Sequence, residues 1–101
     1  MIIDLTKAEK VPFNLDGRIM FKSDKNELIH LTLQPGEELP AHTNPFDVVF
    51  YVLEGNGVLS VANDSFKMKQ DQTFDVKEGI MRAWKNEGES LLRILVIKIL
   101  K

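Results

Sequence analysis

The chain has 101 residues, 44% of them hydrophobic, and its 13 lysine and arginine residues stand against 15 aspartate and glutamate residues, a net charge of −2. These values are typical of one compact soluble domain and argue against a protein that binds a nucleic-acid backbone through clustered positive charge. Because the sequence has no cysteine, it excludes disulfides, thiolate metal sites and cysteine nucleophiles.

The start of the chain, Met1-Ile2-Ile3-Asp4-Leu5, reaches a charged residue after three apolar ones. It therefore lacks the apolar core of a secretory signal, and no later apolar run has the length of a membrane span. We expect a cytoplasmic protein with neither a membrane nor a nucleic acid as its partner.

Short runs rich in β-branched and aromatic residues, separated by turn residues, predict an all-β fold in one domain over residues 1–101. In chain order the expected strands are 18–23, 27–34, 46–53, 58–62, 66–69, 73–76, 80–86 and 91–100. Pairs such as Pro35-Gly36 and Asn63-Asp64 mark the turns between them. No stretch has the apolar spacing of a substantial helix.

Two of these strands lack the alternation of apolar and polar residues that is typical of a strand with one solvent-exposed face. Residues 48–53 are apolar throughout, and only Arg93 and Lys98 interrupt residues 91–100. Successive side chains on a strand point to opposite faces, so both faces should leave water, and a homodimer would cover the outer one. Arg93 and Lys98 differ in parity, so their side chains point to opposite faces of the strand and cannot both point outward. At least one of them should therefore lie at a strand end or meet an acidic partner.

Two segments carry motifs on which a family resemblance rests. The first reads Gly36-Glu37-Glu38-Leu39-Pro40-Ala41-His42-Thr43-Asn44-Pro45-Phe46-Asp47-Val48 and ends in Tyr51-Val52-Leu53-Glu54-Gly55, and the second reads Lys77-Glu78-Gly79-Ile80-Met81-Arg82-Ala83-Trp84-Lys85-Asn86. They resemble the paired motifs of the cupin superfamily, G-x5-H-x-H-x3,4-E-x6-G and P-x-G-x2-H-x3-N, although the second lacks the proline and the histidine. The resemblance implies a double-stranded β-helix, a jelly-roll barrel with a pocket at one mouth, and small cupins are commonly dimers.

The same resemblance identifies the positions of a metal site. In metal-binding cupins three histidines and one glutamate hold the ion, and the matching positions here are His42, Asn44, Val48 and Arg82. Only His42 is a strong metal ligand, and the guanidinium of Arg82 would bring a positive charge to the place of the ion. Asp47 is next to the lost glutamate but has the opposite parity. We expect no metal cofactor, with a divalent transition metal at His42 as the alternative.

Four residues form the candidate ligand-binding site: His42, Asn44, Arg82 and Trp84. The resemblance directs Arg82 into the same cavity as His42, where its paired N–H donors could clamp a carboxylate or a phosphate. Trp84 could stack on a sugar or heterocyclic ring, or it could simply be barrel wall. His42 could transfer a proton, or it could be the remnant of an ancestral metal site.

A buried arginine needs an anion nearby, and Glu38 and Asp47 are the nearest protein candidates in sequence. His30 has the opposite parity to Ile29 and Leu31, so we expect it outside the barrel.

Three functions fit these observations. The first is a metal-free module that binds a small anionic or carbohydrate-like molecule, and this is the function we rank highest. The second is an enzyme, either an isomerase or epimerase that uses His42 or a metal-dependent enzyme, although the sequence identifies no catalytic pair. The third is a structural dimer with a vestigial pocket.

Overall fold

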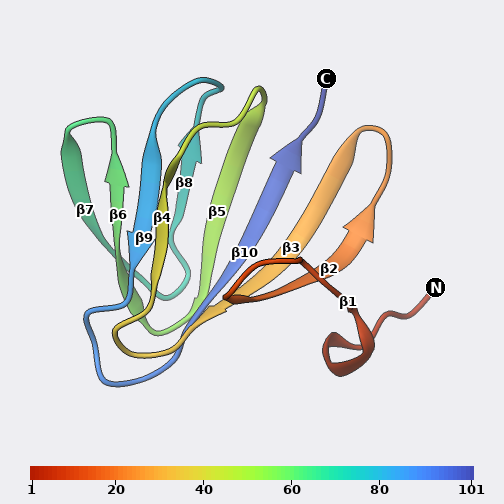
Figure 1. Ribbon diagram of the computed structural model, residues 1–101, viewed down its shortest axis with the longest axis horizontal. Coiled ribbons are helices and arrows are strands. Elements are labelled where there is room, and N and C mark those ends of the chain that lie inside the picture. Colours follow the sequence, from red (N-terminus) through yellow and green to blue (C-terminus); the bar gives the residue numbers. More distant parts are fainter.

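The computed structural model describes residues 1–101 as ten strands and one short 3-10 turn, without an α-helix (Figure 1). In chain order these are η1 (Leu5–Lys7), β1 (Glu9–Lys10), β2 (Asp16–Lys22), β3 (Asn26–Leu33), β4 (Glu38–His42), β5 (Asp47–Glu54), β6 (Asn56–Val61), β7 (Asp64–Lys69), β8 (Thr73–Val76), β9 (Arg82–Lys85) and β10 (Leu92–Ile99). The all-β prediction is confirmed. No helix has the length and the hydropathy that crossing a membrane requires.

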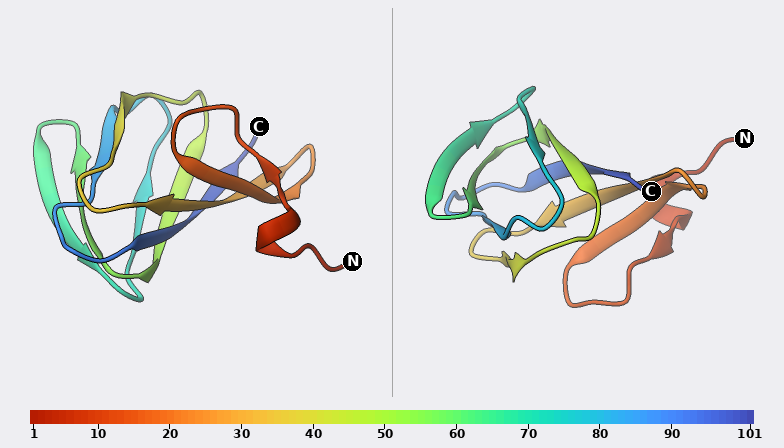
Figure 2. Two further views of the ribbon diagram at one scale, coloured as in Figure 1. Left: turned by 60° about the horizontal axis from the view of Figure 1, so that its bottom comes forward. Right: turned by 90° about the horizontal axis from the view of Figure 1, so that it is seen from above.

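Two antiparallel sheets make up the barrel. A six-stranded sheet has the order β1-β2-β3-β10-β5-β8, and a four-stranded sheet has the order β4-β9-β6-β7. Figure 2 shows the sheets facing each other, with the β2–β3 hairpin extending beyond the barrel. This is the jelly-roll architecture that the paired motifs imply.

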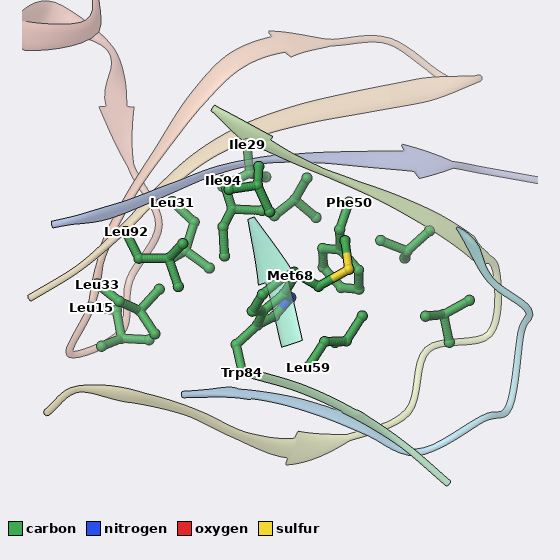
Figure 3. Packing of buried hydrophobic residues seen from close by; sticks show 14 residues of the cluster. Leu15, Ile29, Leu31, Leu33, Phe50, Leu59, Met68, Trp84, Leu92 and Ile94 are labelled. Atoms are coloured by element: carbon green, nitrogen blue, oxygen red, sulfur yellow. The ribbon is translucent and has the colours of Figure 1, made fainter. Parts of the chain in front are cut away.

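The core lies between the sheets and comprises 14 buried residues (Figure 3). The two most apolar strands alternate in burial: Val48, Phe50 and Val52 of β5 face the core, as do Leu92 and Ile94 of β10. Their intervening side chains are only half-buried on the outer face of the six-stranded sheet. In the single chain, the core-facing side of each strand is therefore buried, and its outer side is partly exposed to solvent.

Eight of the ten strands match the predicted ones, with ends that differ by no more than two residues. The prediction missed β1 and β4. In β4 only Leu39 is partly buried and the other four residues are exposed, so the strand contributes little to the core. Pairing with β9 defines this strand, with Leu39 opposite Trp84 and His42 opposite Arg82.

Glycines allow two close approaches at the start of β6. Gly55 has φ +85°, and a Cβ there would collide with the carbonyl oxygen of Leu91. Gly57 is a buried residue of β6, and a Cβ there would press on Leu92 and come within 3.1 Å of the Trp84 ring. Both positions require the smallest residue because the chain leaves no room for a side chain.

His30 lies on the outer face of the six-stranded sheet, as its parity predicts, but it is only 6% exposed. The Nε of Arg93 donates to His30 Nε2 at 3.1 Å, and Arg93 also pairs with Glu54 at 3.1 Å. Burial, and then the positive charge of Arg93, lower the pKa of His30, while Asp16 acts in the opposite direction. At least one of Arg93 and Lys98 was expected to lie at a strand end or to meet an acidic partner, and the pair of Arg93 with Glu54 confirms this.

Candidate functional site

A cavity of about 110 Å³ is lined by 11 residues that come from both sheets and from the N-terminal segment, and 7 of these residues are hydrophobic. Its polar lining comes from His42, Asn44, Arg82 and Lys98. A wider hollow of about 690 Å³, over β6 and β7, has Lys67 and Lys69 among its lining residues but none of the four candidate residues. The smaller cavity is therefore the candidate site.

Segments far apart in the chain bring the polar lining together. His42 ends β4 and pairs in register with Arg82, the first residue of β9. Asn44 lies in the connection that follows β4, and Lys98 is near the end of β10. Three of the four predicted site residues, His42, Asn44 and Arg82, thus line one cavity.

The guanidinium of Arg82 is the central feature of the site, and the residue is only 4% exposed. Its Nη1 donates to the His42 carbonyl at 3.0 Å, and Phe50 lies beneath it, with 5.9 Å between the guanidinium carbon and the ring centroid. When the Asn44 amide is turned so that both of its polar atoms are satisfied, its oxygen accepts from Arg82 Nη2. The Nε is buried without a partner. Burial lowers the pKa of Arg82, although a guanidinium keeps its charge at neutral pH.

No carboxylate of the chain neutralises Arg82, so the two protein candidates were wrong. Glu38 instead pairs with Lys85 at 3.4 Å. Asp47 accepts from the backbone N–H of Glu78 at 2.9 Å, and its carboxylate lies 3.8 Å from Lys77. The partners of Arg82 are neutral oxygens, and this leaves a buried positive charge without a counter-ion in the protein.

Lys98 is a cavity residue that the sequence analysis did not identify as part of the site. Its Nζ lies 3.0 Å from Glu27 Oε1 and 5.9 Å from the centroid of the Phe46 ring. Lys98 shares its parity with the core residue Val96, and that shared parity was the signal available in the sequence. Because Glu27 neutralises Lys98, Arg82 remains the uncompensated charge of the cavity.

Trp84 does not line the cavity, contrary to the prediction. It is 1% exposed and lies in the core, where its ring meets Phe50 edge to face at a centroid distance of 5.5 Å (Figure 3). Its indole N–H is buried without a partner. The parity argument placed Trp84 inside the barrel correctly, but its position within β9 puts it in the packed interior and not at the mouth.

His42 lies at the exposed edge of the cavity. Its Nδ1 is 3.0 Å from the carbonyl oxygen of Pro40. Since a carbonyl oxygen can only accept, Nδ1 carries the hydrogen and the neutral imidazole keeps Nε2 as a free acceptor.

The residues at the four metal positions do not fit a divalent ion. No three histidine, cysteine, aspartate or glutamate side chains come together anywhere in the structure. Val48 is buried in the core, the Asn44 amide is directed to Arg82, and the guanidinium repels a cation. Only His42 could bind a metal, and transition-metal sites in proteins normally use three or four such ligands.

Three comparisons place these features among known proteins. The model of the Cupin domain family matches residues 29–98. Tetracenomycin polyketide synthase protein TcmJ of Streptomyces glaucescens is 30% identical over 67 residues, which are 65% of this chain and 45% of that protein, so the chain spans less than half of its length.

Solved structures show the same architecture. The TT1209 protein of Thermus thermophilus has a TM-score of 0.84 at 25% identity, over 98% of this chain and 96% of that one. A predicted oxalate decarboxylase of Thermotoga maritima has a TM-score of 0.87 at 16% identity over the full length of both chains. At this identity the second likeness supports the fold alone.

Proposed function

The chain belongs to the cupin family, and from that premise we propose that it is a binding module that holds a small anionic molecule at Arg82 without a metal ion. The observation that carries the proposal is the buried guanidinium, which lines the cavity and has no carboxylate partner. A charge buried in this way is stabilised strongly by an anion that enters the cavity.

The lining favours binding over catalysis. Besides Arg82, the titratable side chains of the cavity are His42 and Lys98, and Lys98 is held by Glu27. Proton transfer between two sites of a substrate usually needs a second acid or base beside the first. A carbohydrate is less favoured than an anion, because Trp84 is not available for stacking.

Replacement of the central arginine tests this function. The Arg82→Met variant should bind acetate, phosphate and sulfate at least about tenfold more weakly, since a charge-assisted hydrogen bond is lost. Lys67→Met is the matched control, because it removes one positive charge from β7, outside the cavity. NMR titrations measure binding, and circular dichroism verifies the fold. If a cavity anion binds the folded Arg82→Met variant as tightly as the parent, the proposal is wrong.

The absence of a metal is part of the same proposal and has its own test. Elemental analysis of untagged protein should find less than one transition-metal ion per chain, because His42 is the single strong ligand at the site. The result that contradicts this is a stoichiometric metal that resists a chelator in the parent and disappears in His42→Ala.

A further inference from the structure

We propose that the ligand is a small monocarboxylic acid with a short unbranched apolar body, its carboxylate against Arg82 and its carbons along the apolar wall. This inference rests on the anion-binding function proposed above and specifies its ligand class. Three properties of the cavity lead to it: the number of free charges, the chemistry of the lining and the volume.

The cavity offers one uncompensated positive charge. Arg82 has only neutral partners, while Lys98 is paired with Glu27 at 3.0 Å. One carboxylate therefore neutralises the site. A dicarboxylate or a phosphate dianion would leave a second negative charge among apolar side chains, and an unpaired buried charge is strongly unfavourable.

The remainder of the wall suits carbon atoms better than hydroxyl groups. Ile29 and Leu31 of β3, Leu39 of β4 and Val96 of β10 all line the cavity. A hydroxyl group placed against these side chains would lose its hydrogen bonds to water without replacement, whereas a methylene group gains from leaving water.

The volume limits the length of the apolar body. An engineered cavity of about 150 Å³ accommodates benzene, which has six carbon atoms. By that ratio a cavity of about 110 Å³ holds four or five non-hydrogen atoms within its walls. Propionate and butyrate, with part of the carboxylate toward the mouth, match this size.

A segment from the N-terminal part of the chain forms one wall of the cavity. Val11 and Phe13 both line it. The backbone N–H of Val11 donates to the Gly17 carbonyl at 2.8 Å, and the Phe13 ring packs against Gly17 so closely that a Cβ there would come within 2.7 Å of it. Gly17 thus lets the aromatic ring approach β2 and line the cavity, so we expect the ring to limit the length of the ligand.

A titration series tests the ligand class, with acetate, propionate, butyrate, hexanoate, propionamide, malonate and inorganic phosphate followed by NMR on the full chain. We expect the affinity to rise about fourfold for each methylene from acetate to butyrate and to fall at hexanoate. Propionamide should bind at least about tenfold more weakly than propionate. Phe13→Ala should move the optimum toward hexanoate, whereas Phe66→Ala, which removes an aromatic ring on β7, should leave the order unchanged.

The series separates the two proposals. If malonate or phosphate binds as tightly as butyrate, or if acetate binds best, the monocarboxylate inference is wrong while the anion pocket at Arg82 stands. If Phe13→Ala remains folded and does not change the order of the carboxylates, the size limit set by the ring is wrong. If no anion in the series shifts the signals of the cavity residues, the pocket itself is wrong and both proposals fall.

Discussion

The side chain of Asn86 makes three hydrogen bonds to the backbone. It is fully buried, its Nδ2 donates to the carbonyls of Leu33 at 2.9 Å and Ser90 at 2.8 Å, and its Oδ1 accepts from the N–H of Gly88 at 3.0 Å. The amide thus joins the end of β3 to the loop before β10. Asn86 is the asparagine that matches the second cupin motif, and its role in the structure is to hold this loop, since it does not line the cavity.

Replacing this amide should destabilise the fold. Asn86→Ala removes three hydrogen bonds and leaves buried backbone groups without partners, so we expect the free energy of unfolding to fall by about 2–4 kcal/mol. Urea denaturation measures the change. Asn63→Ala, in the exposed turn between β6 and β7, is the control and should change stability by less than about 0.5 kcal/mol. A similarly small change for Asn86→Ala would show that the loop does not depend on the amide.

His30 predicts a pH dependence of stability. Its pKa is lowered in the folded protein, first by burial and then by Arg93, so the unfolded chain binds a proton more readily. The stabilisation from the neutral ring is complete above the unfolded pKa of about 6.5 and decreases as the pH falls below that value toward the lowered folded pKa.

Urea midpoints at pH 7.5 and pH 5.5 test this sign. The parent should lose more stability on acidification than His30→Gln, which cannot titrate. His42→Gln removes an exposed histidine and serves as the matched control. An equal loss in the parent and in His30→Gln would exclude His30 as the cause.

At the scale of the elements, Gly57 shows how tightly β6 packs on its neighbours. A methyl group there would press on Leu92 and approach the Trp84 ring, and both side chains are buried in the core. We expect Gly57→Ala to lower the free energy of unfolding by about 1–3 kcal/mol, because overpacking forces the core to shift. Thermal and urea unfolding measure the loss. Gly88→Ala is the control, because the added Cβ would lie 3.4 Å from Asn86 Oδ1, an ordinary van der Waals contact, and near no other side chain. Equal stability of the two variants would contradict this account.

The sequence predicted the elements that have their own burial pattern. β5 and β10 were predictable because apolar residues fill their core-facing positions. β4 was not, since pairing with β9 and not burial defines it. Parity placed both Arg82 and Trp84 inside the barrel, but parity does not distinguish the mouth from the packed interior. The cavity walls from Val11 and Phe13 could not be predicted, because only the fold brings that segment to β3.

At the scale of the whole molecule, part of the outer face of the six-stranded sheet is apolar, next to the charged pair of Arg93 and Glu54. Leu28, Val49 and Leu95 are half-buried there, and Phe21 and Ile99 are exposed. Several apolar side chains gathered on one outer face are uncommon on a monomer, so we propose that two copies of the chain associate through this face.

Charge introduced on this face should separate the two copies. Ile97→Asp combined with Ile99→Asp should shift the mass measured by light scattering from a dimer to a monomer, or unfold the chain, because burying two carboxylates in an apolar interface is unfavourable. Met81→Asp, at an exposed apolar residue outside the strands, should leave the mass unchanged. A parent protein that is monomeric at micromolar concentration would overturn the proposal.

The position of β10 has a consequence for folding. It lies between β3 and β5, and its Leu92 pairs with Leu33, which is far away in the sequence. Until Leu92–Ile99 is available, β3 and β5 each present an open edge, and such edges invite pairing with other chains. Non-local pairing of this kind also makes folding slow. Because β10 supplies Val96 and Lys98 to the cavity, the pairing of β10 that closes the sheet also completes the site, and we expect ligand to bind only after this pairing has formed.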